Sequence, residues 1–118
     1  MKMGQEDIYD SFARLMYSIA MVDGTVEKEE KNLLKQELGD HAAWPFVSKY
    51  FESSQQDVYS LVESYKELIE ACKDFGYSED YPVFINVLEK LEKISGDDED
   101  NLVKSFLESL KERLLNKN

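Results

Sequence analysis

The sequence of 118 residues is poor in the residue types that most hydrolytic and metal centres use. It has one histidine, His41, and one cysteine, Cys72, so a zinc site built from several His and Cys ligands is excluded. A Ser-His-Asp or Cys-His system would have to use His41, and no nucleophile motif accompanies that residue. These absences argue against catalysis, and we predict that the chain is not an enzyme.

Long apolar runs and a leader segment are also missing. A membrane-spanning helix needs about 18 consecutive apolar residues, and no stretch of the sequence approaches that length. Residues 1–7 turn acidic at once and contain no apolar core or cleavage site, so the sequence predicts no secretory signal. A single cysteine is what a reducing compartment permits. We therefore predict a cytoplasmic protein without direct membrane insertion.

Positive charge is scarce, because 14 Lys and Arg stand against 25 Asp and Glu and give a formal net charge of -11. Such a surface repels phosphate backbones and anionic lipid headgroups, so we expect no nucleic-acid partner. The same field attracts cations and basic protein surfaces, although a high negative charge also serves solubility. The sequence predicts neither the identity of a partner nor the oligomeric state.

Helix breakers are few, with two prolines and five glycines, and between them apolar residues recur at three- and four-residue spacing. The length fits one domain over residues 1–118. We therefore predict an all-α, compact single-domain bundle. The residues expected on buried helix faces are Ile8, Phe12, Leu15, Met16, Ile19, Leu33, Leu34, Leu38, Val58, Leu61, Val62, Tyr65, Leu68, Ile69, Cys72, Phe84, Val87, Leu88, Leu91, Ile94, Leu102, Val103, Phe106, Leu110 and Leu114.

Capping signals place several helix ends. Ser53 and Gln56 have capping-box spacing before what we expect to be the longest helix, and Asp80 is suited to cap the helix after it. The aromatic segment 42–51 is expected to form a short helix that covers one side of the core. His41 is expected in a loop just before that segment.

A faint internal repeat relates residues 12–38 to residues 84–110, since both have the order helix, turn, acidic helix. Part of this match is common to any helical hairpin. We therefore consider a pseudo-twofold repeat as one arrangement of the bundle, in which two acidic turns approach each other.

The first acidic turn is the most informative stretch. Residues 23–26, Asp-Gly-Thr-Val, followed by Glu30, resemble the second half of an EF-hand loop. Ile19 and Met21 stand where calcium would need oxygen ligands, so a complete, tight EF-hand is excluded and any affinity should be on the order of 0.1 to 1 mM or poorer. The candidate ligands of a divalent cation, calcium or magnesium, are Asp23, Glu30, Asp97 and Asp98.

Residues 15–30 also resemble the TerB-like tellurite-resistance family, whose signature is an apolar helix that runs into Asp-Gly and then into an acidic helix. Asp23, Gly24 and Glu30 match this pattern, whereas Glu27 stands where the family often has a serine that caps the helix. This departure weakens the capping-box interpretation of Glu30 and leaves its carboxylate freer. The resemblance implies a bundle of about six or seven helices. It also implies a role in resistance to tellurite and related stress, with membrane-bound and other protein partners and a divalent metal.

Three functions stay open at this point. The first is a non-enzymatic binding module that recruits a protein partner, membrane-associated proteins included. The second is a small metal-dependent hydrolase built on the four candidate carboxylates, which the scarcity of histidine disfavours. The third is a structural subunit that docks a basic partner through its acidic face. For both acidic turns a purely structural interpretation also holds, because acids stabilise helix N-termini and Gly24 can supply a positive φ.

Overall fold

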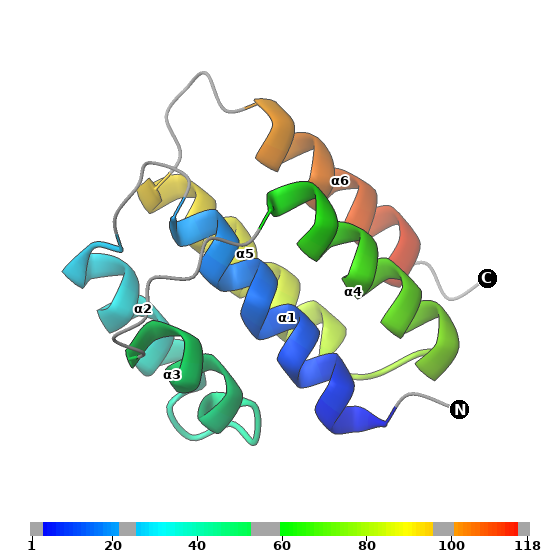
Figure 1. Cartoon of the computed structure of the whole chain (residues 1–118), viewed down its shortest axis with the longest axis horizontal. Helices are drawn as coiled ribbons and strands as arrows, with labels where there is room; N and C mark the ends of the chain where they lie inside the picture. Colours follow the sequence, from blue (N-terminus) through cyan, green and yellow to red (C-terminus); the bar gives the residue numbers. More distant parts are fainter. Residues whose placement is uncertain (1–3, 22–25, 53–59, 96–100, 116–118) are drawn as a thin grey trace.

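The computed structural model describes residues 4–21, 26–52, 60–95 and 101–115. These residues form six α-helices and no strand, and 84% of them are helical. The predicted all-α fold is confirmed. In chain order the helices are α1 (Gln5–Ala20), α2 (Lys28–Leu38), α3 (Trp44–Glu52), α4 (Leu61–Phe75), α5 (Tyr81–Ser95) and α6 (Asn101–Leu115) (Figure 1).

The helix α1 lies at the centre of the bundle and packs against α3, α4 and α5. It begins after Gly4, whose N–H group donates to the Asp7 carboxylate over 2.9 Å. Apolar residues follow at helical spacing, and every side chain over residues 15–20 is buried. A helix that is buried on nearly all sides belongs in the core of a bundle. The ring of Phe12 lies 4.7 Å from the ring of Phe84 on α5.

The helices α2 and α3 cover one side of this centre. α2 packs against α5 and α3 and buries Leu34 and Leu38, while α3 packs against α1 and buries Val47 and Phe51. The short helix predicted over residues 42–51 is therefore present and contributes to the core. Its other aromatic side chains, Trp44, Phe46 and Tyr50, are partly buried against the core.

The helix α4 begins later than the sequence predicted. Ser60 caps it, because the Ser60 Oγ accepts a hydrogen bond from the Glu63 amide over 3.3 Å. The cap predicted at Ser53 is wrong for this helix, and Ser53, Gln56 and Val58 lie outside the described residues. The expectation that this would be the longest helix is also wrong, since α1 has 16 residues and α4 has 15.

The helix α6 packs mainly on α5 and only lightly on α4. Two ion pairs link α5 and α6, from Lys111 to Glu89 at 3.4 Å and from Lys104 to Glu92 at 4.0 Å. α2, by contrast, packs against α5 and α3 and not mainly on α1. Because the pairs α1–α2 and α5–α6 are packed differently, the packing gives no support to a pseudo-twofold repeat.

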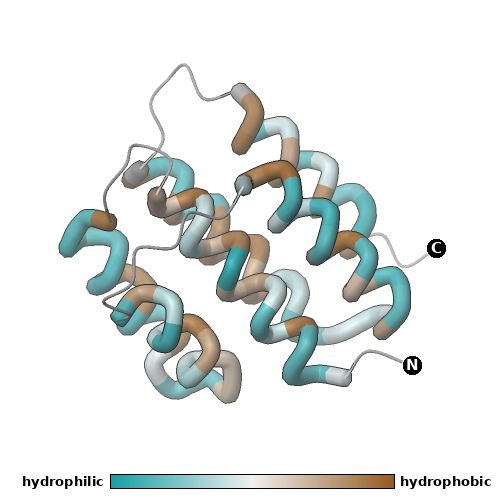
Figure 2. Tube along the Cα trace, viewed as in Figure 1, coloured by the Kyte–Doolittle hydropathy of each residue, from teal (hydrophilic) through white to brown (hydrophobic). Residues whose placement is uncertain are grey.

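Hydrophobic and hydrophilic residues are interspersed along each described helix (Figure 2). Most residues predicted to be buried are buried, including Ile8, Leu15, Leu88 and Leu110. Three predictions are wrong, because Val62, Ile94 and Leu102 are 39%, 38% and 49% exposed. Each lies in the first or last turn of its helix, at the edge of the bundle. None of the described helices has the length and apolar character needed to cross a membrane.

Candidate functional site

Of the four predicted metal ligands, the structure describes Glu30, whereas Asp23, Asp97 and Asp98 lie outside the described residues. Glu30 is fully buried in the first turn of α2, and its Oε1 accepts a hydrogen bond from the Glu27 amide over 2.5 Å. The expectation that Glu27 weakens a capping box is therefore wrong, since Glu30 forms a capping box with the Glu27 backbone. The role of Glu30 as a metal ligand stays a prediction. Within the described ranges, no group of three or more His, Cys, Asp or Glu side chains is arranged to hold a metal ion.

His41 lies in the loop before α3, as predicted, but it has a partner that the sequence did not indicate. Its Nδ1 accepts a hydrogen bond from the Ala43 amide over 2.9 Å, so this nitrogen carries no proton and Nε2–H donates to Asp80 over 3.1 Å. The Tyr9 hydroxyl donates to the other Asp80 oxygen over 2.9 Å. Asp80 directly precedes α5, where the sequence predicted a cap, but its side chain joins α1 to the loop before α3.

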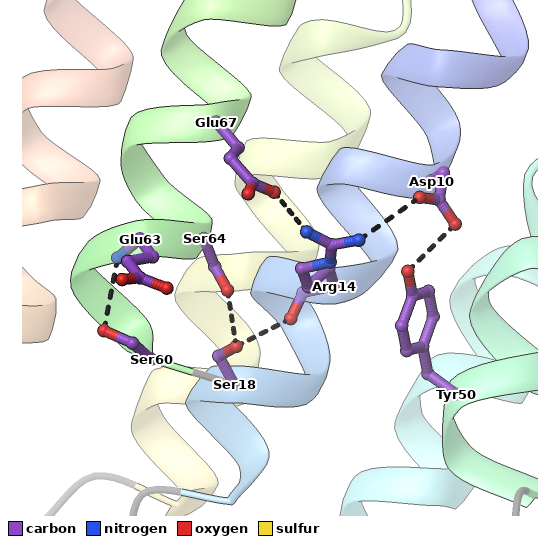
Figure 3. Close-up of polar contacts among 8 residues, drawn as sticks. All are labelled: Asp10, Arg14, Ser18, Tyr50, Ser60, Glu63, Ser64 and Glu67. Carbon is purple, nitrogen blue, oxygen red and sulfur yellow. Dashed lines mark hydrogen bonds and ion pairs between the residues drawn. The ribbon is translucent and has the colours of Figure 1, made fainter. Parts of the chain in front are cut away.

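A second polar network centres on Arg14, near the middle of helix α1 (Figure 3). Its guanidinium forms an ion pair with Glu67 of α4 and lies 4.0 Å from Asp10. Tyr50 of α3 donates to Asp10 over 2.9 Å, and Ser18 of α1 donates to the Arg14 carbonyl. The network ties α1 to α3 and α4, two of its three neighbours, which is a structural role.

Where α4 and α6 meet, each helix has one exposed apolar residue in its first turn, Val62 and Leu102, followed by the partly buried residues Tyr65, Ile69 and Phe106. Figure 1 shows the two helices side by side, and the rings of Tyr65 and Phe106 stack between them at 4.3 Å. The Tyr65 hydroxyl also donates to Ser109 of α6 over 2.7 Å. Residues spaced by three and four positions share one side of a helix. We call this surface the α4–α6 seam and define it by Val62, Tyr65 and Ile69 of α4 and by Leu102, Phe106 and Ser109 of α6.

A pocket of about 410 Å³ opens at the C-terminal end of the seam, where α4 and α6 meet the start of α5. Gly76 shapes its wall, because its φ of 97° and ψ of -160° form a conformation that is essentially restricted to glycine. This turn lets the Gly76 carbonyl accept a hydrogen bond from the Tyr81 hydroxyl over 2.5 Å. The lining residues are Ile69, Cys72, Lys73, Gly76, Tyr77, Tyr81, Arg113 and Leu114.

Burial controls the protonation of the inner residues of this pocket. It raises the pKa of the Cys72 thiol to about 11, and the hydrogen bond with Tyr81 lowers the pKa by less. Burial likewise raises the pKa of Tyr81, with Cys72 adding to the effect. Both groups are therefore neutral near pH 7, and the Cys72 thiol is a poor nucleophile because the reactive form is the thiolate.

These shifts predict that the fold loses stability at alkaline pH. The pKa of Cys72 rises from 9.0 to about 11 and that of Tyr9 from 10.0 to about 12, the latter mainly through burial and then through Asp80. The folded chain holds both protons more tightly than the unfolded chain, so this stability is present below about pH 9 and is lost as pH rises through about 11 and 12.

Urea denaturation across this pH range measures the loss. The matched control is Cys72→Ala, which should show a smaller fall between pH 9 and 11 because it has no thiol to ionise. Equal falls in the two proteins would show that Cys72 titrates alike in the folded and unfolded chains.

No family model, curated protein or solved structure matches this chain. The sequence did not indicate Lys73 and Arg113 as site residues, since a base in the last turn of a helix is expected from the helix dipole alone. Their separation of forty residues gave no local signal that they meet at one pocket.

Proposed function

We propose that this chain is a non-enzymatic binding module that recruits a protein partner through the α4–α6 seam. The exposure of Val62 and Leu102, at 39% and 49%, carries this proposal. Their spacing in the sequence predicts that both lie on the apolar faces of their helices, yet the bundle does not cover them. An apolar surface that the bundle leaves exposed is typical of a contact with another protein. Aromatic residues at its centre, Tyr65 and Phe106, are of the kind that anchors such contacts.

Two further observations support binding over catalysis. Both ring nitrogens of His41 are engaged, one by the Ala43 amide and one by Asp80, so the ring is held as part of the fold. Cys72 is buried and its raised pKa keeps it as a thiol. His41 and Cys72 are therefore engaged in hydrogen bonding and packing within the fold.

The net charge of -11 favours a partner whose apolar contact residues are surrounded by basic ones. The resemblance to the TerB-like proteins implies that the chain and its partner act in a cytoplasmic stress response. It also implies that membrane-associated proteins are among the partners. That role stays a prediction, since Asp23 and Gly24, which carry the resemblance, lie outside the described residues.

Site-specific photo-crosslinking in the cell of origin tests the recruitment. A photoreactive amino acid at Leu102 should give one discrete adduct, and the same group at Glu29, exposed on the distant helix α2, should not. Adding Val62→Glu should lower the yield at Leu102 by about tenfold, because a charge on an apolar contact must lose its water. Raised salt should slow the association. The same adducts from both positions, unaffected by Val62→Glu, would contradict a docking role for the seam.

A further inference from the structure

The pocket at the end of the α4–α6 seam has a charge opposite to that of the chain. Its charged lining residues are Lys73 and Arg113, both exposed at the surface of a protein with a net charge of -11. Other cations, such as Lys90 and Lys111, are paired with carboxylates. Over the described part of the chain, neither Lys73 nor Arg113 has an ion-pair partner.

Arg113 is oriented by Ser109, one turn earlier in α6. Its Nε donates to the Ser109 hydroxyl over 3.3 Å, and Ser109 also accepts from Tyr65 over 2.7 Å. The terminal nitrogens of a guanidinium form a planar fork that matches the two oxygens of a carboxylate. Ser109 thus fixes one edge of the Arg113 fork at the rim of the pocket.

The other residues that line the pocket suit the apolar part of a ligand, which we call its body. Ile69 and Leu114 are half-buried, and the ring of Tyr77, which is 48% exposed, stands edge-on to the ring of Tyr81 at 6.1 Å. A volume of about 410 Å³ falls in the range of about 300 to 1,000 Å³ that small-molecule sites occupy. The neutral Cys72 adds no negative charge to the inner wall.

From these observations we infer that the pocket binds a small organic carboxylate with an apolar body. The carboxylate lies at Lys73 and Arg113, and the body packs against the Tyr77 ring. This inference does not rest on the proposed recruitment, since Val62 and Leu102 lie at the other end of the seam.

The partial charges of the helix ends favour a carboxylate over a phosphate as the ligand of the pocket. The pocket faces the C-terminal ends of α4 and α6, and each contributes roughly half a negative charge. Two cations against two such ends leave about one net positive charge. A singly charged carboxylate matches this value, whereas a doubly charged phosphate exceeds it. Helix N-termini, which favour phosphate, are represented at the pocket only by Tyr81 at the start of α5.

Three probes that share one body but differ in the charge of the head group test this inference. Phenylpropionate should give saturable shifts in NMR spectra of the full chain, centred on Ile69, Tyr77 and Leu114. Phenylpropanol and phenylpropylamine should bind at least about fivefold more weakly, because they lack the charge that meets the cations. Inorganic phosphate should compete poorly. If the alcohol or the amine binds as tightly as the carboxylate, or phosphate displaces it fully, the assignment is overturned.

Single substitutions locate the binding. Lys73→Gln and Arg113→Gln should each weaken phenylpropionate binding about fivefold. Both residues are exposed, so the fold should persist, and thermal melting checks this. The matched control is Lys66→Gln, which removes the same charge from an exposed position of α4 outside the pocket and should leave the affinity unchanged. Equal weakening in all three variants would show diffuse attraction to cations and no site.

Discussion

Phe12→Ala is expected to lower the free energy of unfolding by about 3 to 5 kcal/mol. Phe12 is 1% exposed at the centre of α1, and its ring lies 4.7 Å from the Phe84 ring and 5.9 Å from the Tyr81 ring. Removing it leaves a cavity between α1 and α5, and the surrounding helices can close that cavity only in part. Leu15→Ala, at a fully buried position, should cost about 2 to 5 kcal/mol.

Denaturant unfolding followed by circular dichroism gives both values. Tyr77→Ala is the matched control, because Tyr77 is an aromatic residue that is 48% exposed, and its loss should cost about 1 kcal/mol or less. A cost for Phe12→Ala no greater than that of the control would mean that α1 is not the centre of the core.

The position of Phe12 was predictable because helical period is a local property. Ile8, Phe12, Leu15 and Ile19 share one stripe in the sequence, and the structure buries all four. The start of α4 was not predictable in the same way. Ser53 and Ser60 are both suitable caps by residue type, and Ser60 is the one whose hydroxyl accepts an amide hydrogen bond at the start of α4. Local sequence does not choose between two such signals.

Exposure at the helix ends also depends on tertiary structure. Leu102 has the spacing of a buried residue, but it lies in the first turn of α6 and is 49% exposed. Spacing tells which side of a helix is apolar and does not tell whether a neighbouring helix covers that side. The α4–α6 seam therefore depends on how α4 and α6 pack side by side, which spacing within one helix does not determine.

The two cationic side chains of the pocket also could not be assigned to one site from the sequence. Lys73 and Arg113 each sit near a helix C-terminus, where the dipole alone explains a base. Their shared position follows from the side-by-side arrangement of α4 and α6. The acidic turn, by contrast, was conspicuous in the sequence, yet Glu30, the one candidate ligand that the structure describes, accepts a hydrogen bond through Oε1 that caps α2.

For Asp80, the interpretation from neighbouring sequence differs most from the role seen in the structure. The sequence predicted a helix cap, whereas its side chain accepts hydrogen bonds from Gln5, Tyr9 and His41 over 3.3, 2.9 and 3.1 Å. These partners precede it by 75, 71 and 39 positions. Only the folded chain brings them to the start of α5.

Asp80→Ala is accordingly expected to lower the free energy of unfolding by about 2 to 4 kcal/mol, because it leaves the donors of Tyr9 and His41 without an acceptor and each such loss costs about 1 to 3 kcal/mol. Asp80→Asn should recover part of this loss, since its amide oxygen can accept from one donor. The adjacent substitution Glu79→Ala, at an exposed acid, is the control and should change stability by about 0.5 kcal/mol or less.

A second measurement separates the hydrogen bonds of Asp80 from a loss of packing. The pKa of Tyr9 is raised to about 12 by burial first, then by the hydrogen bond and the charge of Asp80. In the folded Asp80→Asn variant the carboxylate charge is gone and the burial remains, so the Tyr9 pKa should fall but stay above its ordinary value of 10.0. NMR titration of the labelled Tyr9 ring measures this shift. An unchanged pKa, or a loss of stability matched by Glu79→Ala, would mean that Asp80 does not hold α1 and the loop before α3 to the start of α5.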